Sequence, residues 1–372
     1  MKDLWASLKE DISLTDRLMI LCAFLLGIWG VFCIYSAGAG AAGRGFDLAF
    51  RQAMWLFVSL LAMLFIMIIG HNKLLEGAYP LYGLMLLLLL LTDLLAPKVN
   101  GAQSWLGFGG IRFQPSEFAK VSIILVMSKF LSRYPPLDIK TFIAGLAVIS
   151  LPVFLVLLQP DAGSALVYLV ISFGMLLAAG TPLKYLFTIA GTGLAALPVL
   201  IIFVLKDYQR NRILVFIDPM RDPLGAGYNV IQSRIAVGSG GFSGKGFMMG
   251  TQSKLKFLPE PHTDFIFSVF SEEFGFIGNV ILITLFAVLL FRVILTGIKA
   301  RDRRCKILTA GVASWLWFQM FESMGMSIGL TPVTGLPLPF LSYGGSSLLA
   351  TFMALGLVAS IYISEVNSKR VF

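Results

Sequence analysis

Apolar runs of membrane-spanning length recur along the 372 residues of this chain, and they constrain its fold more than any other feature. About 20 apolar residues in an α-helix cross a hydrocarbon core of about 30 Å. Lipid offers exposed backbone groups no partner, so runs of this length are helical. The sequence therefore predicts an all-α polytopic integral membrane protein with about ten transmembrane helices. The expected spans are 18–37, 50–70, 77–96, 115–132, 141–158, 162–180, 184–206, 265–296, 307–330 and 345–366.

Two of these spans carry features that are unusual in lipid. Residues 115–132 contain Glu117 and Lys120, and residues 141–158 contain Pro152. A helix inside a bundle tolerates such residues when its neighbours satisfy the polar groups. The composition supports the membrane assignment, because only 13% of the residues are charged, whereas a soluble domain has about a quarter.

Basic residues predict the orientation of the spans. Ten spans place both termini on one side, and that side holds most of the basic residues, including the dense group at 292–306. The short loops of the other side contain only Arg44, Arg51, Lys98 and Arg112. The positive-inside rule therefore makes both termini cytoplasmic. The net charge of +9 is mainly an orientation signal, with added attraction to anionic membrane lipids, and the scattered basic residues argue against nucleic-acid binding.

One large extracytoplasmic loop, residues 207–264, separates the seventh and eighth spans. Loops of this length are usually functional, and we treat this one as part of a single membrane domain, residues 1–372. The stretch "GYNVIQSRIAVG" predicts a surface helix whose apolar face carries Tyr228, Ile231 and Ile235, with Ser233 elsewhere.

A glycine-rich stretch, "GSGGFSGKGFMMG", follows that helix and resembles a nucleotide-binding loop. Gly246 stands where such a loop requires Ser or Thr. The predicted location outside the cell, where ATP is scarce, also argues against nucleotide binding.

Charged residues recur on the extracytoplasmic side. Glu117 and Lys120 begin the fourth span at i,i+3 spacing, and "QPDAGSA" places Asp161 just before the sixth. An ion pair and a helix cap are the ordinary explanations. The segment "GLTPVTGLPLPFLSYGGSS" carries no charge, predicts a rigid re-entrant wall, and has Ser342 near its end. A shared outward-facing polar site explains this set better than coincidence does.

Three glutamates fall inside predicted spans. Glu272 and Glu273 suggest a wet interior face of the eighth span, and Glu322, deep in the ninth, requires a partner.

The stretch "FLPEPHTDFIF", residues 257–267, places Asp264 at the first turn of the eighth span. There it either caps the helix, whose N-terminus favours an anion, or serves as a desolvated general base with a raised pKa. In an extended segment Glu260, His262 and Asp264 would share one side. That arrangement is a weak signal for a divalent cation such as Mg²⁺ or Mn²⁺.

The cations Arg112, Lys120, Arg210 and Lys245 suit a phosphate or pyrophosphate at the membrane boundary. A buried carboxylate suits removal of a proton from a hydroxyl group. Together these features describe group transfer from a lipid pyrophosphate to an alcohol. The same features also suit movement of that lipid across the bilayer.

The motifs resemble those of the SEDS family over essentially the whole chain. They are "GAQSWLGFGGIRFQPSEFAK", "QPDAGSA", "DPLGAGYNVIQSRIAVGSGGFSGKG", "GTQS", "FLPEPHTDFIF" and "LPFLSYGGSS". Within the family, "GTQSKLKFLPE" and the short N-terminal head favour the elongation polymerases over their division homologues.

This resemblance implies a ten-helix glycosyltransferase of the bacterial cytoplasmic (inner) membrane. Such an enzyme polymerises lipid II into β-1,4 glycan strands of peptidoglycan, with inversion at the anomeric carbon, during cell elongation and rod-shape maintenance. The implied partners are lipid II, the growing glycan strand, a class B penicillin-binding protein that acts as transpeptidase, and other membrane proteins of the elongation complex.

The resemblance also implies roles for individual residues. Asp264 in "HTDFIF" would be the catalytic base. Substrate-binding or cavity residues would be Arg112, Glu117, Lys120, Asp161, Arg210, Gln232, Lys245 and Ser342.

Two rival functions remain open. A lipid II flippase predicts polar residues at the bilayer midplane, where Glu322 is the one candidate, and no inverted repeat of the kind many transporters show is evident. A scaffold that only recruits cell-wall enzymes would not need the cluster of carboxylates and cations.

Overall fold

The computed structural model describes residues 15–39, 43–97, 104–108, 111–199, 207–255 and 257–370. Helices occupy every predicted span, although residues 200–206 of the seventh lie outside the described residues. The long helices are α2 (Arg17–Ala39), α3 (Gly45–Ile69), α5 (Ala78–Leu95), α6 (Pro115–Arg133), α7 (Ile139–Leu158), α8 (Ala162–Ala178), α9 (Leu183–Val199), α13 (Ile266–Lys299), α14 (Arg303–Ile328) and α15 (Gly345–Arg370). The short α4 (His71–Glu76) joins α3 to α5.

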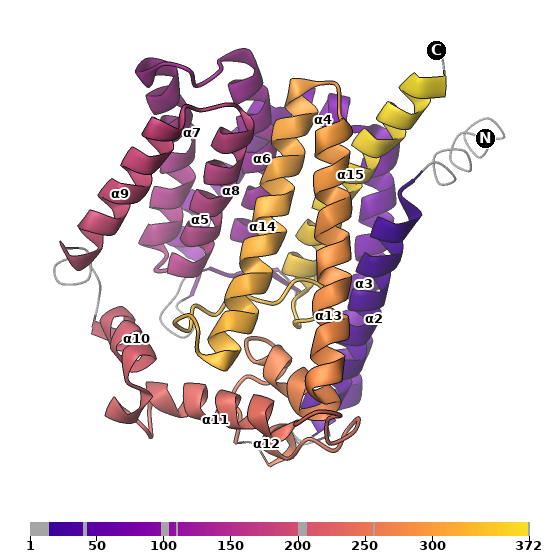
Figure 1. Cartoon of the computed structure of the whole chain (residues 1–372), viewed down its shortest axis with the longest axis vertical. Helices are drawn as coiled ribbons and strands as arrows, with labels where there is room; N and C mark the ends of the chain where they lie inside the picture. The colour runs from indigo at the N-terminus through magenta and orange to yellow at the C-terminus, as the bar shows by residue number, and fades with distance from the viewer. Residues whose placement is uncertain are drawn as a thin grey trace.

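Six helices in the described part of the chain are long and apolar enough to cross a membrane: α2, α3, α5, α7, α13 and α15. The helix α8 is also apolar but has only 17 residues. Figure 1 shows these helices standing side by side in one bundle, with α2 beginning and α15 ending at the same end. The chain is therefore an all-α, multi-pass membrane protein.

Local sequence sets several helix ends. Asp138 and Asp161 cap α7 and α8 by accepting hydrogen bonds from backbone N–H groups three residues ahead. Pro115 occupies the first turn of α6. Gly329 ends α14 with φ of 75°, a left-handed conformation that glycine adopts without strain.

The last helix, α15, forms the centre of the bundle. Within its most apolar stretch 78% of the residues are buried, whereas the corresponding share is 22–44% in the other five membrane-length helices. It packs on α3, α6, α13 and α14. Side chains such as Phe352, Leu355 and Val358 are fully buried there, so α15 is shielded from lipid by the helices around it.

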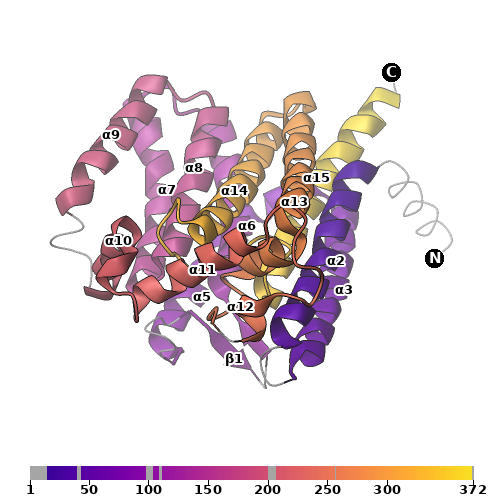
Figure 2. The same cartoon turned by 60° about the horizontal axis from the view of Figure 1, so that its bottom comes forward.

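Short helices lie across one end of the bundle, which we call the loop end (Figures 1 and 2). They are α10 (Asp207–Ile217), the 3₁₀ helix η2 (Pro219–Arg221), α11 (Ala226–Ser239) and α12 (Thr251–Lys254). The surface helix predicted from "GYNVIQSRIAVG" is confirmed as α11.

The predicted face of α11 is wrong. Its buried side carries Val230, Ser233 and Ala236, and Ile235 is exposed. Ser233 is buried because its hydroxyl has partners from two helices, Ser268 Oγ at 2.7 Å and the carbonyl oxygen of Ser327 at 2.6 Å. Hydrogen bonding thus decides which face is buried.

The glycine-rich segment 240–246 packs against a break in α13. Gly275 interrupts the helix with φ of 63° and ψ of −160°. The carbonyl groups of Gly241 and Phe242 accept from the N–H groups of Phe276 and Ile277 at 2.9 and 3.1 Å. In return, the N–H groups of Lys245 and Gly246 donate to carbonyl groups of α13, each at 3.0 Å. The segment therefore supplies the hydrogen bonds that the helix loses at its break.

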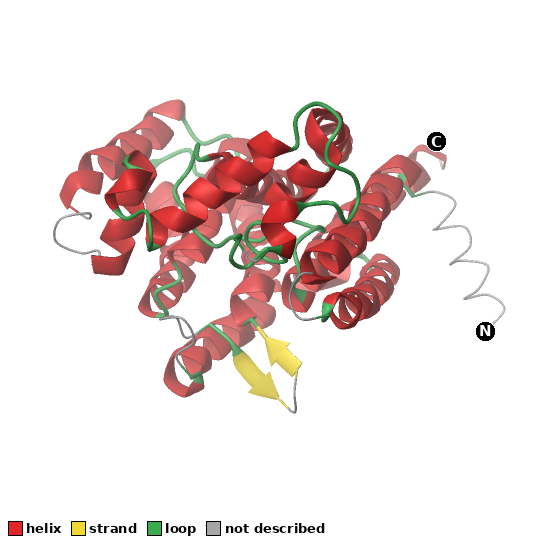
Figure 3. Cartoon of the chain, turned by 90° about the horizontal axis from the view of Figure 1, so that it is seen from below, coloured by secondary structure: helices red, strands yellow, loops and turns green. Residues whose placement is uncertain are grey.

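A small hairpin precedes α6. Strands β1 (Leu106–Phe108) and β2 (Ile111–Phe113) pair antiparallel, with Gly107 opposite Arg112. Figure 3, seen from the loop end, shows the hairpin projecting beside the helices.

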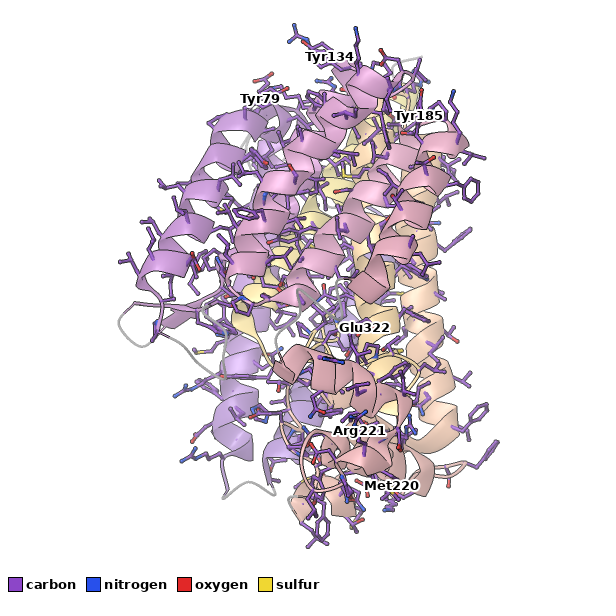
Figure 4. All side chains as sticks on the ribbon, turned by 90° about the vertical axis from the view of Figure 1, so that its left-hand side faces the viewer. Tyr79, Tyr134, Tyr185, Met220, Arg221 and Glu322 are labelled. Carbon is purple, nitrogen blue, oxygen red and sulfur yellow. The ribbon has the colours of Figure 1, made fainter. Side chains whose placement is uncertain are left out.

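The opposite end of the bundle carries cations stacked on tyrosine rings. Lys129 lies 4.9 Å from the centre of the Tyr79 ring, Arg133 5.6 Å from that of Tyr134, and Lys184 5.0 Å from that of Tyr185. Figure 4 shows the three tyrosines at this end, far from Met220 and Arg221 at the loop end. Tyrosines and cations at one level are typical of a membrane–water interface.

Candidate functional site

Asp264 lies in a series of turns, residues 258–265, that leads into α13. It is half-buried, and one carboxylate oxygen, Oδ2, lies 3.5 Å from where a Cβ on Gly335 would stand. The N-cap of α13 is Phe265, whose side chain makes no capping hydrogen bond. Asp264 is therefore not the cap of this helix, which leaves its carboxylate available for another role.

The surroundings of Asp264 make it a stronger base than an exposed aspartate. Burial raises the pKa of its carboxyl group, and the neighbouring Glu260 carboxylate raises this pKa further. A hydrogen bond from Thr263 and the positive charge of Arg212 act in the opposite direction. The net effect on the pKa is upward, as a general base near neutral pH requires.

Ser342 joins the Asp264 segment to the loop between α14 and α15. Its hydroxyl donates to the carbonyl oxygen of Thr263 at 2.8 Å and accepts from the N–H of Leu338 at 2.8 Å. The N–H of Tyr343 donates to the carbonyl oxygen of His262 at 2.9 Å. Ser342, a site residue predicted from the sequence, therefore lies beside the Asp264 segment. Both hydrogen bonds of its hydroxyl are made with backbone groups.

Side chains of α10, α11 and α14 bond the backbone of the loop 329–344. Arg234 of α11 donates to the carbonyl oxygen of Gly329 at 3.2 Å, and Arg212 of α10 to that of Val333 at 3.3 Å. From α14, Gln319 donates to the carbonyl oxygen of Pro337 at 3.1 Å. These contacts agree with the rigid wall expected from the sequence.

Glu322 has the partner that its position in α14 requires. Its carboxylate accepts from the hydroxyl of Thr334 at 2.8 Å, and its backbone carbonyl accepts from the hydroxyl of Thr331 at 3.3 Å. Figure 4 shows Glu322 on the loop-end side of the bundle. Glu322 therefore holds Thr334, the residue before Gly335, by a hydrogen bond.

Glu117 and Lys120 form a buried ion pair at 2.8 Å, with side-chain exposures of 2% and 0%. The Lys120 ammonium also lies 3.4 Å from Gln319 Oε1 and 4.8 Å from the centre of the Trp315 ring. A buried lysine needs such a set of partners, because desolvation of the charge costs several kcal/mol. The ion pair offered as the ordinary explanation of this spacing is present.

Asp161 lies near this pair and caps α8. It accepts from the N–H and the hydroxyl of Ser164 at 3.0 and 2.7 Å. Burial raises the pKa of Asp161, and the hydrogen bonds from Ser164 oppose that shift. The backbone beyond Asp161 packs on loop 329–344, because a Cβ on Gly163 would stand 3.2 Å from Leu336.

Lys245, for which the sequence suggested a phosphate contact, lies apart from this set. Its ammonium pairs with Glu272 at 2.7 Å and donates to the hydroxyl of Thr251 at 3.0 Å. Glu272 also accepts from the N–H groups of Thr251 and Gln252. The wet face predicted for Glu272 and Glu273 is wrong as well, since their side chains are 0% and 1% exposed.

Three other residues predicted for the site take no part in the contacts described above. Arg210 is exposed on α10, and Gln232 is half-buried on α11. The structure places Arg112 on β2 but does not describe its side chain.

The idea of a metal bound by Glu260, His262 and Asp264 gains no support. The segment turns instead of extending, and Glu260 has φ of 44°. Among the described residues, no three His, Cys, Asp or Glu side chains are grouped to hold a metal ion. In this arrangement the three residues do not form a metal site.

Sequence reasoning missed Arg212 and Gln319. Arg212 could have been found, because it lies two residues after Arg210 in the same "DYQRNRIL" stretch. Gln319 carries no charge and lies in an apolar helix, so no local pattern marks it.

The bundle and its buried charged groups near the loop end define a membrane protein with a polar site at one membrane face. A family model described as cell cycle proteins, for FtsW, RodA and SpoVE, matches residues 16–367. The chain therefore belongs to this family, the SEDS family.

Individual relatives are similar over almost their whole length. Peptidoglycan glycosyltransferase MrdB of Escherichia coli (strain K12) is 37% identical over 350 residues, which cover 93% of each protein. Relatives named FtsW also match the chain.

Two solved structures share the fold. One is a chain of a peptidoglycan synthase complex that coordinates polymerization and crosslinking, with a TM-score of 0.82 and 35% identity over 94% of this chain and 98% of that one. The other is the rod shape determining protein RodA of Thermus thermophilus, with a TM-score of 0.70 and 31% identity over 94% of this chain and 96% of that one.

Proposed function

We propose that this protein is a peptidoglycan glycosyltransferase, which joins lipid II disaccharide units into β-1,4 glycan strands. The observation that carries the proposal is the position of Asp264. Its carboxylate is half-buried against Gly335, does not cap α13, and has a raised pKa. Relatives named peptidoglycan glycosyltransferase support the reaction class.

In the proposed reaction Asp264 removes the proton from the 4-hydroxyl of the acceptor sugar. The hydroxyl oxygen attacks the anomeric carbon of the donor and forms the new C–O bond. The bond between that carbon and the pyrophosphate breaks, and its electron pair leaves with the lipid pyrophosphate. Attack from the face opposite the leaving group inverts the α-linkage to β, and the proton on Asp264 then passes to solvent.

We assign the pyrophosphate to the arginines of α10. Arg212 lies close enough to Asp264 to affect its pKa, and Arg210 is exposed on the same helix. Arg112 on β2 is a further candidate. Arginine suits this task because its guanidinium group binds phosphate oxygens in a bidentate manner. Lys245 is not part of this assignment, because its ammonium pairs with Glu272.

We further propose that ten helices span the bacterial cytoplasmic membrane as a single domain. The four beyond the six apolar ones are α6, α8, α9 and α14, which stand beside them in the bundle. The distribution of basic residues supports cytoplasmic termini and an extracytoplasmic loop at 207–264.

We also propose a class B penicillin-binding protein as partner and a role in cell elongation. A similar chain, at a TM-score of 0.82, belongs to a complex that coordinates polymerization and crosslinking. The likeness to a rod shape determining protein supports elongation over division.

The deciding experiment compares polymerisation of labelled lipid II by wild type and Asp264→Asn, each purified with its transpeptidase. The matched control is Asp138→Asn, at an exposed aspartate that does cap a helix. We expect glycan ladders from wild type and control, and none from Asp264→Asn.

Two other outcomes contradict the proposal. Normal ladders from Asp264→Asn would remove Asp264 as the base. If no protein polymerises but vesicles gain transbilayer movement of lipid II, the protein is a flippase.

A further inference from the structure

Gln319 lies at the junction between the buried ion pair and the loop that contacts Asp264. Its side chain is fully buried on α14. Its amide oxygen accepts from Lys120 Nζ at 3.4 Å and from the indole N–H of Trp315. Its amide nitrogen donates to the carbonyl oxygen of Pro337 at 3.1 Å. Each end of this amide therefore has a partner of the matching kind.

The partners fix which way the amide points. Lys120 and Trp315 only donate hydrogen bonds, and a backbone carbonyl only accepts them. Turning the amide over would place two donors against donors and an acceptor against the Pro337 carbonyl. In a buried site such a mismatch costs about 1–3 kcal/mol for each unsatisfied group. Lys120, Trp315 and the Pro337 carbonyl thus determine the direction in which Gln319 presents its donor.

Pro337 lies between the two places where loop 329–344 meets the Asp264 segment. Two residues before it, Gly335 stands beside Asp264 Oδ2. One residue after it, the N–H of Leu338 donates to Ser342, whose hydroxyl donates to Thr263. Both contacts depend on the path of the backbone through residues 335–338.

We propose that Gln319 is a positioning residue, which ties the Glu117–Lys120 pair to the backbone at Pro337 and thereby holds loop 329–344 against Asp264. This inference rests on the proposed function, because the consequence of the tie is the placement of the base. Gln319 does not touch the reacting atoms.

A positioning role predicts loss of rate without loss of substrate affinity. Misplacement of a catalytic group by about 1 Å costs up to about 100-fold in rate. The substrate contacts proposed above come from α10 and β2, whereas the described hydrogen bonds of Gln319 go to Lys120, Trp315 and Pro337.

Two variants distinguish the contribution of the amide nitrogen of Gln319 from that of the whole amide group. Gln319→Glu, when ionised, keeps an acceptor for Lys120 and Trp315 but has no donor for the Pro337 carbonyl. Gln319→Met keeps the length of the side chain, removes all three hydrogen bonds and adds no charge. The matched control is Ser128→Ala, which removes a buried side-chain hydrogen bond of 2.6 Å to the carbonyl oxygen of Arg304, on a different part of α14.

The measurements are kcat and KM for lipid II polymerisation per folded molecule, the melting temperature, and the pH–rate profile. We expect kcat to fall at least about tenfold in both Gln319 variants, with KM within about twofold of wild type. In Gln319→Met we also expect the acid limb to move to lower pH. Water reaches Asp264 when the loop loosens, which lowers the pKa of Asp264, while Glu260, Arg212 and Thr263 are unchanged.

The control distinguishes positioning from general stability. Ser128→Ala should lower the melting temperature and leave kcat, KM and the pH–rate profile unchanged. If the Gln319 variants behave like this control, or if neither accumulates as folded protein, Gln319 only supports the bundle and the proposal is wrong.

Asp264→Asn in the same assay tells the two proposals apart. If it is inactive while the Gln319 variants are normal, only this inference fails. If it polymerises normally, the assigned base fails, whatever the Gln319 variants do.

Discussion

The hydroxyl of Ser342 donates a 2.8 Å hydrogen bond to the carbonyl oxygen of Thr263, the residue before Asp264. Two loops that lie far apart in the sequence therefore meet directly at the proposed base. The same hydroxyl accepts from the N–H of Leu338, so its loss frees two backbone groups.

Ser342→Ala should lower both stability and activity. A buried backbone group left without a partner costs about 1–3 kcal/mol, so the melting temperature should fall, and kcat should fall with it as Asp264 shifts. Ser150→Ala is the control, because Ser150 is exposed and bonds only within its own helix. Equal melting temperatures for the two variants would contradict the role of Ser342.

The pH dependence of polymerisation should report the charges around Asp264. A base works when deprotonated, so the acid limb of the pH–rate profile follows its pKa. Glu260→Gln removes a negative neighbour, lowers the pKa of Asp264, and should move the limb to lower pH. Arg212→Gln removes a positive neighbour and should move it to higher pH. Shifts of the same sign in both variants would exclude Asp264 as the titrating group.

Arg212 and Lys245 should differ in their effect on substrate binding. Arg212→Gln should raise KM for lipid II several-fold if α10 holds the pyrophosphate. Lys245→Met removes a charged hydrogen bond to Glu272, worth about 1.5–3 kcal/mol, and should lower the melting temperature while KM stays within about twofold. A raised KM for Lys245→Met with unchanged stability would restore its predicted phosphate contact.

The Glu117–Lys120 pair should tolerate joint replacement better than single replacement. Lys120→Met leaves an uncompensated buried carboxylate, at a cost of about 3–5 kcal/mol. The double variant Lys120→Met with Glu117→Gln removes that charge and should recover part of the stability. Thermal unfolding of wild type, Lys120→Met, Glu117→Gln and the double variant in detergent tests this, and additive losses would show that the two residues do not interact.

The break in α13 should be intolerant of side chains. A Cβ on Gly275 would stand 2.2 Å from the backbone nitrogen of Gly244, in a conformation with φ of 63°. Gly275→Ala should therefore destabilise the protein by more than the 1–3 kcal/mol or so of backbone strain alone. Gly238→Ala meets nothing within 4 Å, lies inside α11, and should be neutral or slightly stabilising.

The sequence predicted those features whose cause is local. The length of the apolar runs predicted the position of every membrane-length helix. Asp161 and Pro115 lie at helix starts, as the sequence indicated. The i,i+3 spacing of Glu117 and Lys120 predicted their pairing, because that spacing is a neighbour relation on any helix.

Relations between distant residues were not predictable. Lys245 pairs with Glu272, which lies 27 residues further along the chain, and no sequence pattern near Lys245 indicates this partner. The break at Gly275 depends on hydrogen bonds from segment 240–246, so the apolar run alone reads as one continuous helix. Gln319 gains its contacts only when α6, α14 and loop 329–344 come together.

The central place of α15 also bears on how the protein is made. Ribosomes synthesise this helix after every helix it touches, and it is the least lipid-exposed of the membrane-length helices. The earlier helices can enter the bilayer one by one, but their shared interior closes only when residues 345–370 arrive. Closure of the interior around the proposed site therefore has to wait for the synthesis of α15.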